Sequence, residues 1–228
     1  MSLLPRRNVP LGFLLALLAG CAGSARAQGY KAEPLNEPPP QELSAAVRDA
    51  LAPAGIRVTG PNGPLCDLWF RKALPANPNP AQDIGVAFPQ VAEGTLVGVM
   101  RLPAATKDYR RQEIKTGVYT LRDARTPQNG NHLGVAPQRD FLLASPAAAD
   151  PDPASLTFDQ TVALSKKATG ANHPSVWSLS PAEDNPKALP SVFHVDDGDL
   201  WLVEFQVPVA GGAPLKMALV VVGYAPEA

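Results

Sequence analysis

Proline limits the fold of this chain more than any other residue type, since it makes up 26 of the 228 residues. That share is twice the usual value of about 5%. Proline fixes one backbone dihedral and lacks an amide hydrogen, so long helices are interrupted and strands joined by stiff loops are favoured. Apolar residues make up 45% of the chain, which is typical of a globular protein. The composition therefore predicts a packed, β-rich domain.

The segment 191–209, SVFHVDDGDLWLVEFQVPV, has the clearest strand pattern in the sequence. Two apolar runs flank Asp197 and Gly198, and an Asp-Gly pair between such runs is the strongest short signal for a β-hairpin. With these two residues at the tip, His194 is expected to lie opposite Trp201. The segment thus predicts two adjacent antiparallel strands.

Other segments with alternating or continuous apolar residues predict further strands. They are 56–60, 65–74, 94–102, 113–124, 139–147 and 215–225. A set of short strands joined by short loops indicates an antiparallel β-sandwich of jelly-roll or immunoglobulin-like type. A β-barrel is the alternative, because the sequence does not specify the order of the strands.

Two short helices are predicted beside these strands. In the segment 41–55, apolar residues recur at every fourth position before a proline and a glycine, which predicts an amphipathic helix. In the segment 156–170, Thr157 and Gln160 match a capping box, and Gly170 is placed to end the helix. The expected fold class is therefore mainly β with two short helices.

The first 20 residues have the features of a bacterial export signal. Two arginines precede an apolar run at 11–20, which is too short to span a bilayer, since a spanning helix needs about 20 residues. The sequence LAGC at 18–21 ends this run and resembles the lipobox of bacterial lipoproteins. This resemblance implies that residues 1–20 are removed and that Cys21 becomes the lipid-bearing first residue of the mature protein.

A second cleavage site, ARA at 25–27, fits ordinary signal peptidase and would remove residues 1–27. The protein would then be periplasmic or secreted. Residues 21–41 are predicted to attach the lipid and to form a Pro-rich tether, and residues 42–228 to form a single β-rich domain with an N-terminal helix. A lipidated protein is expected in the bacterial envelope, at the outer membrane or facing the periplasm, with the membrane as a partner through the lipid on Cys21.

Short motifs for cofactor binding, metal binding or catalysis do not occur in the sequence. There is no Gly-rich phosphate loop, no Cys-x-x-Cys pair, no His-Glu-x-x-His and no Gly-x-Ser-x-Gly. No cofactor and no metal are therefore expected. The formal net charge is -1 and basic residues are not clustered, which argues against a nucleic-acid partner. The pairs at 110–111 and 166–167 are interpreted as solvated surface.

Three histidines, His132, His173 and His194, are the candidates for a shared metal site. Their spacing matches no short metal motif, and His194 is expected to face Trp201 on an apolar face of the hairpin. The acidic residues around Asp197 are explained by the hairpin turn rather than by a calcium ion. Separate roles for the three histidines are therefore expected.

Two long loops, 125–140 and 168–186, are the best candidates for a binding site, because functional residues on β scaffolds concentrate in loops. The candidate ligand-binding residues are His132, Arg139, His173 and Trp177. Amide, imidazole and indole groups in these loops suit a sugar or a peptide, with stacking on the indole. Trp177 is equally suited to fill the end of the core.

The sequence thus predicts an exported, lipid-anchored envelope protein that acts as a non-catalytic binding or accessory module. Its expected partner is an envelope protein or a carbohydrate. The alternative is an exported hydrolase or metalloenzyme with its site on the two loops. The strand GVYTLR at 117–122 and the terminal hairpins resemble uncharacterised exported β-domain proteins of bacteria, a resemblance that implies no functional residue.

Overall fold

The computed structural model describes residues 29–80, 83–129, 132, 136–184 and 188–226. The predicted signal peptide, the LAGC sequence and Cys21 lie outside this part of the chain. None of the helices in the described residues has the length and hydropathy needed to span a bilayer. The elements are, in chain order, β1 (Lys31–Leu35), α1 (Ala45–Ala50), β2 (Gly55–Gly60), β3 (Gly63–Phe70), β4 (Leu96–Leu102), β5 (Thr106–Lys107), β6 (Glu113–Ile114), β7 (Gly117–Arg125), β8 (Asp140–Pro146), the 3-10 helix η2 (Ala147–Ala149), α2 (Phe158–Thr169), β9 (Ser175–Pro181), β10 (Ser191–Val195), β11 (Leu200–Val207) and β12 (Leu215–Val222).

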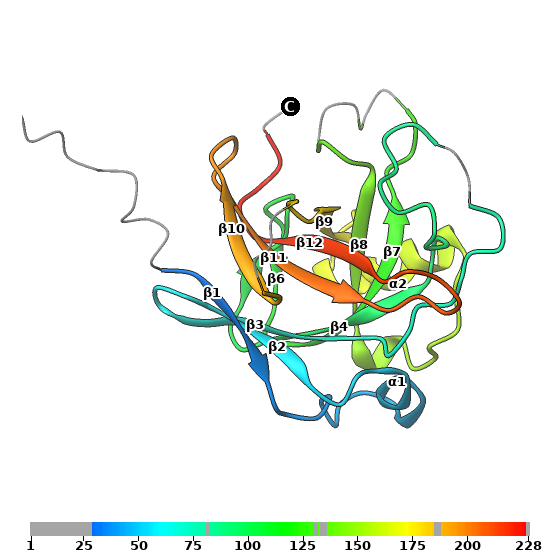
Figure 1. Ribbon diagram of the computed structural model, residues 1–228, viewed down its shortest axis with the longest axis horizontal. Helices are drawn as coiled ribbons and strands as arrows, with labels where there is room; N and C mark the ends of the chain where they lie inside the picture. Colours follow the sequence, from blue (N-terminus) through cyan, green and yellow to red (C-terminus); the bar gives the residue numbers. More distant parts are fainter. Residues whose placement is uncertain (1–28, 81–82, 130–131, 133–135, 185–187, 227–228) are drawn as a thin grey trace, which may run out of the picture.

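Ten of the strands form one antiparallel sheet that curls nearly into a barrel (Figure 1). The strand order is β1-β2-β3-β4-β7-β8-β9-β12-β11-β10. β9 joins the two halves of this sheet, because its residues 175–178 pair with β8 and its residues 179–181 pair with β12. The two ends of the sheet, β1 and β10, lie side by side. Next to them, Tyr30 stacks on Trp201 with ring centroids 4.2 Å apart.

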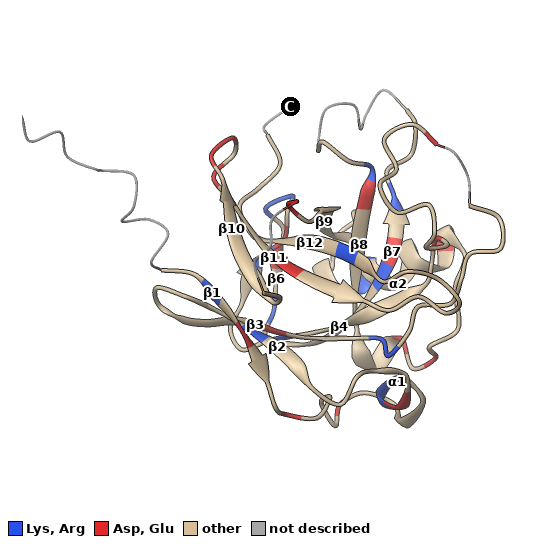
Figure 2. Cartoon of the chain, in the orientation of Figure 1, with Lys and Arg blue, Asp and Glu red and all other residues tan. Residues whose placement is uncertain are grey.

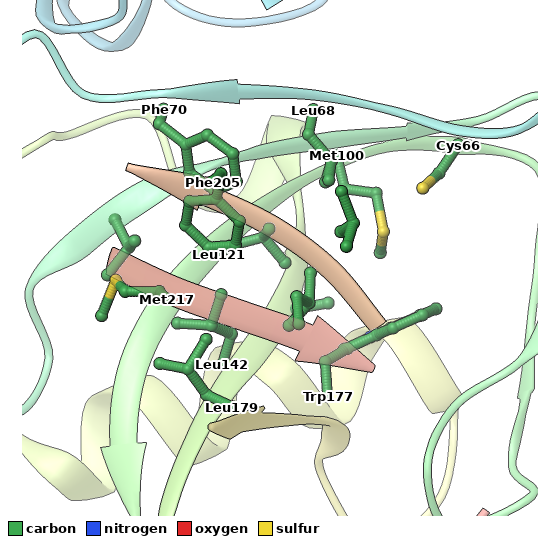
Figure 3. Close-up of a cluster of buried hydrophobic side chains, with 14 of the residues drawn as sticks. Cys66, Leu68, Phe70, Met100, Leu121, Leu142, Trp177, Leu179, Phe205 and Met217 are labelled. Carbon is green, nitrogen blue, oxygen red and sulfur yellow. The ribbon is translucent and has the colours of Figure 1, made fainter. Parts of the chain in front are cut away.

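The two halves of the sheet enclose the main hydrophobic core (Figure 3). Phe70 from β3 and Phe205 from β11 stack across this core with ring centroids 3.8 Å apart. Cys66 of β3 also lies in it, and burial raises the pKa of the Cys66 thiol to about 12. The curled sheet is therefore held closed by side chains that meet from opposite walls.

Each helix covers a different part of the sheet's other face. α1 packs through Val47 in one cluster with Trp69 and Val99, which we call the α1 face. α2 lies across β8 and β9, over a second cluster that includes Phe141 and Val176, which we call the α2 face. The full α1 face consists of Leu35, Leu43, Val47, Leu51, Trp69, Leu96, Val99 and Ala147. The α2 face consists of Tyr109, Ala124, Phe141, Leu143, Val176, Leu202, Ala218 and Val220, with half-buried Phe158 and Val162 packed against it.

The predicted fold class, mainly antiparallel β with two short helices, is confirmed. The nearly closed sheet has the shape of the barrel that the sequence left open as an alternative. The C-terminal hairpin has the predicted register, with His194 opposite Trp201. The capping box of Thr157 and Gln160 is present, and Gly170 ends α2 with a φ of 65°.

The Pro-rich segment at 21–41 is not a free tether over its described part, so this prediction is wrong there. Lys31–Leu35 forms β1 and pairs antiparallel with β2. Further along, the indole Nε1 of Trp69 donates a hydrogen bond to the carbonyl of Glu37 at 2.9 Å. Pro34 is tolerated because β1 is an edge strand, where one row of amide hydrogens has no partner strand. The folded domain therefore begins before its predicted start.

The segment 168–186 is not one long loop, because β9 lies inside it. Ser175 and Ser178 are both buried on this strand. Because these buried positions hold small polar residues, a pattern based on hydrophobicity alone did not predict the strand. Within the described residues, the predicted loop is thereby limited to 170–174 and 182–184.

Candidate functional site

A cavity of about 280 Å³ lies between α2 and the strands β7, β8 and β9. Its volume is close to the lower limit of small-molecule sites, which is about 300 Å³. Its floor is apolar and comes from the α2 face. The floor residues are Ala124, Phe141, Leu143 and Val176 on the strands and Phe158 and Val162 on the helix. A concave and mostly apolar site of this kind suits a small ligand.

One buried serine holds α2 against the sheet and so determines the shape of the cavity. Ser165 Oγ donates to the Ala144 carbonyl on β8 at 2.7 Å and accepts from the Ser175 amide on β9 at 2.9 Å. Phe158 and Val162, the apolar residues of the helix that line the cavity, remain half-buried. Because the helix is anchored through a small polar side chain, space remains between its larger side chains and the sheet. The cavity occupies this space.

Cationic side chains and histidines line the cavity, and none of its described lining residues carries a carboxylate. The guanidinium of Arg125 donates to the Val91 carbonyl at 2.8 Å. In the described part of the chain, the side chains of Arg110 and Lys166 have no ion pair and no hydrogen bond. The cationic and imidazole residues are Arg110, Arg125, Lys166, His132 and His173. The cavity therefore combines an apolar floor with two cations, exposed Arg110 and half-buried Lys166, that have no carboxylate partner among the described residues.

A tight turn carries Arg110 and is fixed to β9 by Asp108. The buried carboxylate of Asp108 accepts hydrogen bonds from the amides of Arg110, Gln112 and Val176 at 2.9 to 3.0 Å. Burial raises the pKa of Asp108, and these hydrogen bonds oppose the rise. Since backbone amides occupy this carboxylate, it does not pair with the Arg110 guanidinium.

His173 is half-buried at the cavity, and burial lowers its pKa. The charges of Arg110 and His132 lower the pKa further, whereas the hydrogen bond to Pro174 and the charge of Asp108 oppose this effect. Its Nδ1 lies 3.0 Å from the Pro174 carbonyl oxygen, so this nitrogen is the donor. In the neutral ring Nε2 is then an acceptor. At neutral pH His173 is therefore an uncharged hydrogen-bonding group.

Of the four predicted ligand-binding residues, the structure brings His132 and His173 to this cavity but not Arg139 or Trp177. Arg139 Nε and Nη2 donate to the Thr126 carbonyl at 3.0 and 2.9 Å. Trp177 is only 3% exposed and packs in the main core, where it borders a second cavity of about 70 Å³. Its indole is therefore not placed to stack on a sugar in the α2 cavity.

Two residues of the cavity, Arg110 and Lys166, were interpreted from the sequence as solvated surface; Arg110 is exposed, as this interpretation has it, whereas Lys166 is half-buried. Arg110 and Lys166 both line the cavity. A signal for Lys166 was present, because Phe158, Val162 and Lys166 follow one another at intervals of four residues and so share one side of α2. No local pattern connects Arg110 with this helix, since their proximity depends on the tertiary fold.

A second group of charges, around Arg122, is fully paired within the fold. Arg122 Nε and Nη2 donate to the buried Asp150 carboxylate at 2.7 and 2.8 Å. The remaining hydrogens of its guanidinium bond to the backbone carbonyls of residues 94, 152 and 154. The adjoining loop also contacts the start of α1, because Ser44 Oγ donates to the Pro151 carbonyl. This cluster stabilises the fold and leaves no charge for a ligand.

A third group of charges lies on β2, β3 and β4 and is also paired. Asp67 accepts hydrogen bonds from Arg57 Nε at 2.7 Å and from Arg101 Nε at 3.0 Å, and Glu37 accepts from Arg101 Nη2 at 2.8 Å. Burial by itself would raise the pKa of Asp67, but the two arginines bring it below its ordinary value. Acidic and basic segments accordingly lie next to each other on β2 and β3 (Figure 2).

Metal ligands do not gather in the described residues, where no group of three or more His, Cys, Asp or Glu side chains could hold an ion. His194 is separate from the other histidines. Its ring lies against Trp201 with centroids 4.6 Å apart, and its Nε2 is 2.7 Å from Asp199 Oδ1. Only His132 and His173 are close enough for one charge to affect the other.

Comparison of the chain with protein-family models, with curated protein sequences and with solved structures gave no match. In the described part of the chain, the cavity beneath α2 is the larger of two cavities where apolar surface lies next to a cation without a carboxylate partner, the smaller one being bordered by Lys107.

Proposed function

We propose that this protein is an exported, non-catalytic binding module whose small-molecule ligand occupies the cavity beneath α2. The observation that carries the proposal is the cavity, with about 280 Å³ of space over an apolar floor. Protein interiors are otherwise close-packed. An empty apolar cavity lowers stability, because the side chains that line it lack van der Waals contacts on one side. A ligand that fills this space restores the missing contacts.

The lining of the cavity supports binding better than catalysis. A histidine that activates a nucleophile needs the nucleophile within hydrogen-bond reach and a third group to orient the ring. Among the described lining residues there is no serine, no cysteine and no acid. A hydrolase or metalloenzyme on the two loops has correspondingly weaker support. The apolar floor also suits an apolar ligand better than a carbohydrate.

Calorimetric titration of the purified protein with octanoate and with 1-octanol tests this proposal. At least one of the two is expected to bind, and Val162→Phe is expected to abolish binding, because the larger side chain enters the cavity. Ala163→Phe is the matched control, since residue 163 is exposed on the same helix and lies outside the lining. Absence of binding by the original protein, or unchanged binding by V162F, contradicts the proposal.

The proposal extends to the site of action, which is supported by the sequence of residues 1–21. The apolar run favours export, and the LAGC sequence favours a lipid on Cys21. Because β1 begins at Lys31, such a lipid would hold the domain near the membrane surface. Cleavage after Ala27 instead would release a periplasmic or secreted protein.

The intact mass of the native mature protein, taken from membrane and soluble fractions, tests the location. A chain that starts at Cys21 and carries the mass of a lipid supports the anchored form. A chain that starts at Gln28 without lipid contradicts it, while leaving export and the binding proposal in place.

A further inference from the structure

We infer that the ligand of the α2 cavity is an amphipathic anion, with an apolar body and one carboxylate-type charge. The inference rests on the proposed function, that this cavity binds a small molecule. It adds the chemical class of that molecule. Two independent features carry it: the apolar floor and the unpaired cations beside it.

The cations come from two separately held elements. Arg110 lies on the turn that Asp108 fixes to β9, and Lys166 lies in the last turn of α2. The charge of Arg110 also lowers the pKa of His173, because it disfavours the protonated ring. The two cations therefore face a common space from the sheet side and from the helix side. That arrangement creates a positive potential over the apolar floor.

The absence of compensating acid makes this charge available to a ligand. None of the described lining residues is Asp or Glu. Arg122 is paired with Asp150 and Arg101 with Asp67, whereas exposed Arg110 and half-buried Lys166 have no carboxylate partner among the described residues. Unpaired cations next to apolar surface attract an anion and repel a cation, whereas a neutral ligand gains nothing from them.

The floor and the volume define the apolar part of the ligand. Phe141, Leu143 and Val162 present hydrocarbon and aromatic surface, which favours an alkyl or aryl group. About 280 Å³ is too small a space for a lipid with two acyl chains. A free monocarboxylate with a short alkyl or aryl body is therefore the ligand class that both features favour.

Three ligands with the same eight-carbon chain separate charge from apolar contact: octanoate, 1-octanol and n-octylamine. Calorimetry near neutral pH and at low salt is expected to show octanoate binding about tenfold tighter than 1-octanol, since each nearby cation contributes a few-fold. Octylamine is expected to bind more weakly than either. At about 0.5 M sodium chloride the preference for octanoate is expected to shrink, because salt screens exposed charges.

A pair of lysine variants tests the source of the preference. Lys166→Ala is expected to weaken octanoate binding several-fold and to leave 1-octanol binding unchanged. Lys167→Ala is the matched control, because Lys167 is the exposed neighbour on the same helix and lies outside the lining. This control variant is expected to bind all three ligands like the original protein.

The outcomes distinguish this inference from the proposal on which it rests. Equal affinity for octanoate and 1-octanol, or a preference for octylamine, overturns the inference that the ligand is an anion. The proposed binding function is unaffected by either result. An equal loss for octanoate and 1-octanol in K166A also overturns it, because the lysine would then act through packing. No binding of any of the three overturns both.

Discussion

The two helices lie on the outside of one sheet, yet they pack on it in different ways. α1 buries Val47 completely in a cluster with Trp69 and Val99, and every core member of that cluster is buried. α2 fully buries only Thr161 and Ser165, which are small and polar. The α1 face is therefore closed by hydrocarbon, whereas the α2 face is held by hydrogen bonds and retains a cavity.

The two faces also differ in whether the cationic side chains near them have carboxylate partners. Near α1, Arg122 and Arg101 bond to carboxylates within the fold. At the α2 cavity, Arg110 and Lys166 have no such partner in the described residues. The comparison teaches that the α1 face is closed and its neighbouring arginines are paired, whereas the α2 face keeps a cavity bordered by two cations that have no carboxylate partner among the described residues. Each prediction below tests one part of this difference.

The largest effect is expected from removing a paired arginine. Arg122→Ala leaves the Asp150 carboxylate buried without its partner, and this type of change costs about 3–5 kcal/mol. Arg110→Ala, at the cavity, is expected to change the free energy of unfolding by less than about 0.5 kcal/mol. Urea unfolding measures both. Similar losses in the two variants would contradict the distinction between paired and unpaired cations.

The same substitution on the two helices compares the packing of the two faces. Val47→Phe is expected to lower the free energy of unfolding by about 1–3 kcal/mol, because the α1 face has no room for a larger side chain. Val162→Phe is expected to cost less than about 0.5 kcal/mol, because the new ring enters the cavity. Thermal unfolding is the measurement, and a larger loss for V162F than for V47F would contradict the account.

Asp123 tests whether unsatisfied charge also occurs inside the sheet, next to the lining residues Ala124 and Arg125 on β7. It is fully buried on β7, and neither carboxylate oxygen has a hydrogen-bond partner among the described residues. Burial raises its pKa well above the ordinary value; Arg125 opposes this rise, and Asp140 and Glu93 add to it. The folded state therefore binds the Asp123 proton more tightly than the unfolded state does.

Because of this difference, stability from Asp123 is highest at low pH. It falls as the pH rises above the unfolded pKa of about 3.9. Asp123→Asn removes this loss, so the variant is expected to be more stable than the original by about 1 kcal/mol or more near neutral pH. The gain should shrink when unfolding is measured near pH 4. A gain independent of pH would show that the carboxyl group does not titrate as described.

The smallest effect is a change in the pKa of His173, measured by NMR titration of its ring. Arg110→Ala is expected to raise this pKa, because the Arg110 charge now lowers it. Saturation with octanoate is expected to raise it as well, since an anion favours the charged ring, whereas 1-octanol is expected to have little effect. An unchanged pKa in R110A would place the guanidinium too far away to act on the cavity.

The features that could be predicted from the sequence are those fixed by neighbouring residues. The hairpin register depends on Asp197 and Gly198 at its tip, and the cap of α2 depends on Thr157 and Gln160 within one turn. In each case all the determining groups lie within a few positions of one another. Local rules were therefore sufficient.

The features that could not be predicted depend on distant contacts. β1 was not predicted because it contains Pro34 and precedes a Pro-rich segment, and it is a strand only because β2 pairs with it. His132 and His173 were selected by residue type, but Arg110 and Lys166 were not, because a lone pair of basic residues usually marks solvated surface. Their joint position at one cavity requires the curl of the sheet and the placement of α2 across β8 and β9.

The most direct test of the account is an NMR titration of the protein with octanoate, observed at valine and leucine methyl groups. The account predicts shifts at Val162, Leu143 and Val176, which line the cavity, and none at Val47 or Val99 on the α1 face. Shifts on the α1 face, or no shift at the cavity, would contradict the claim that the α2 face is the ligand site.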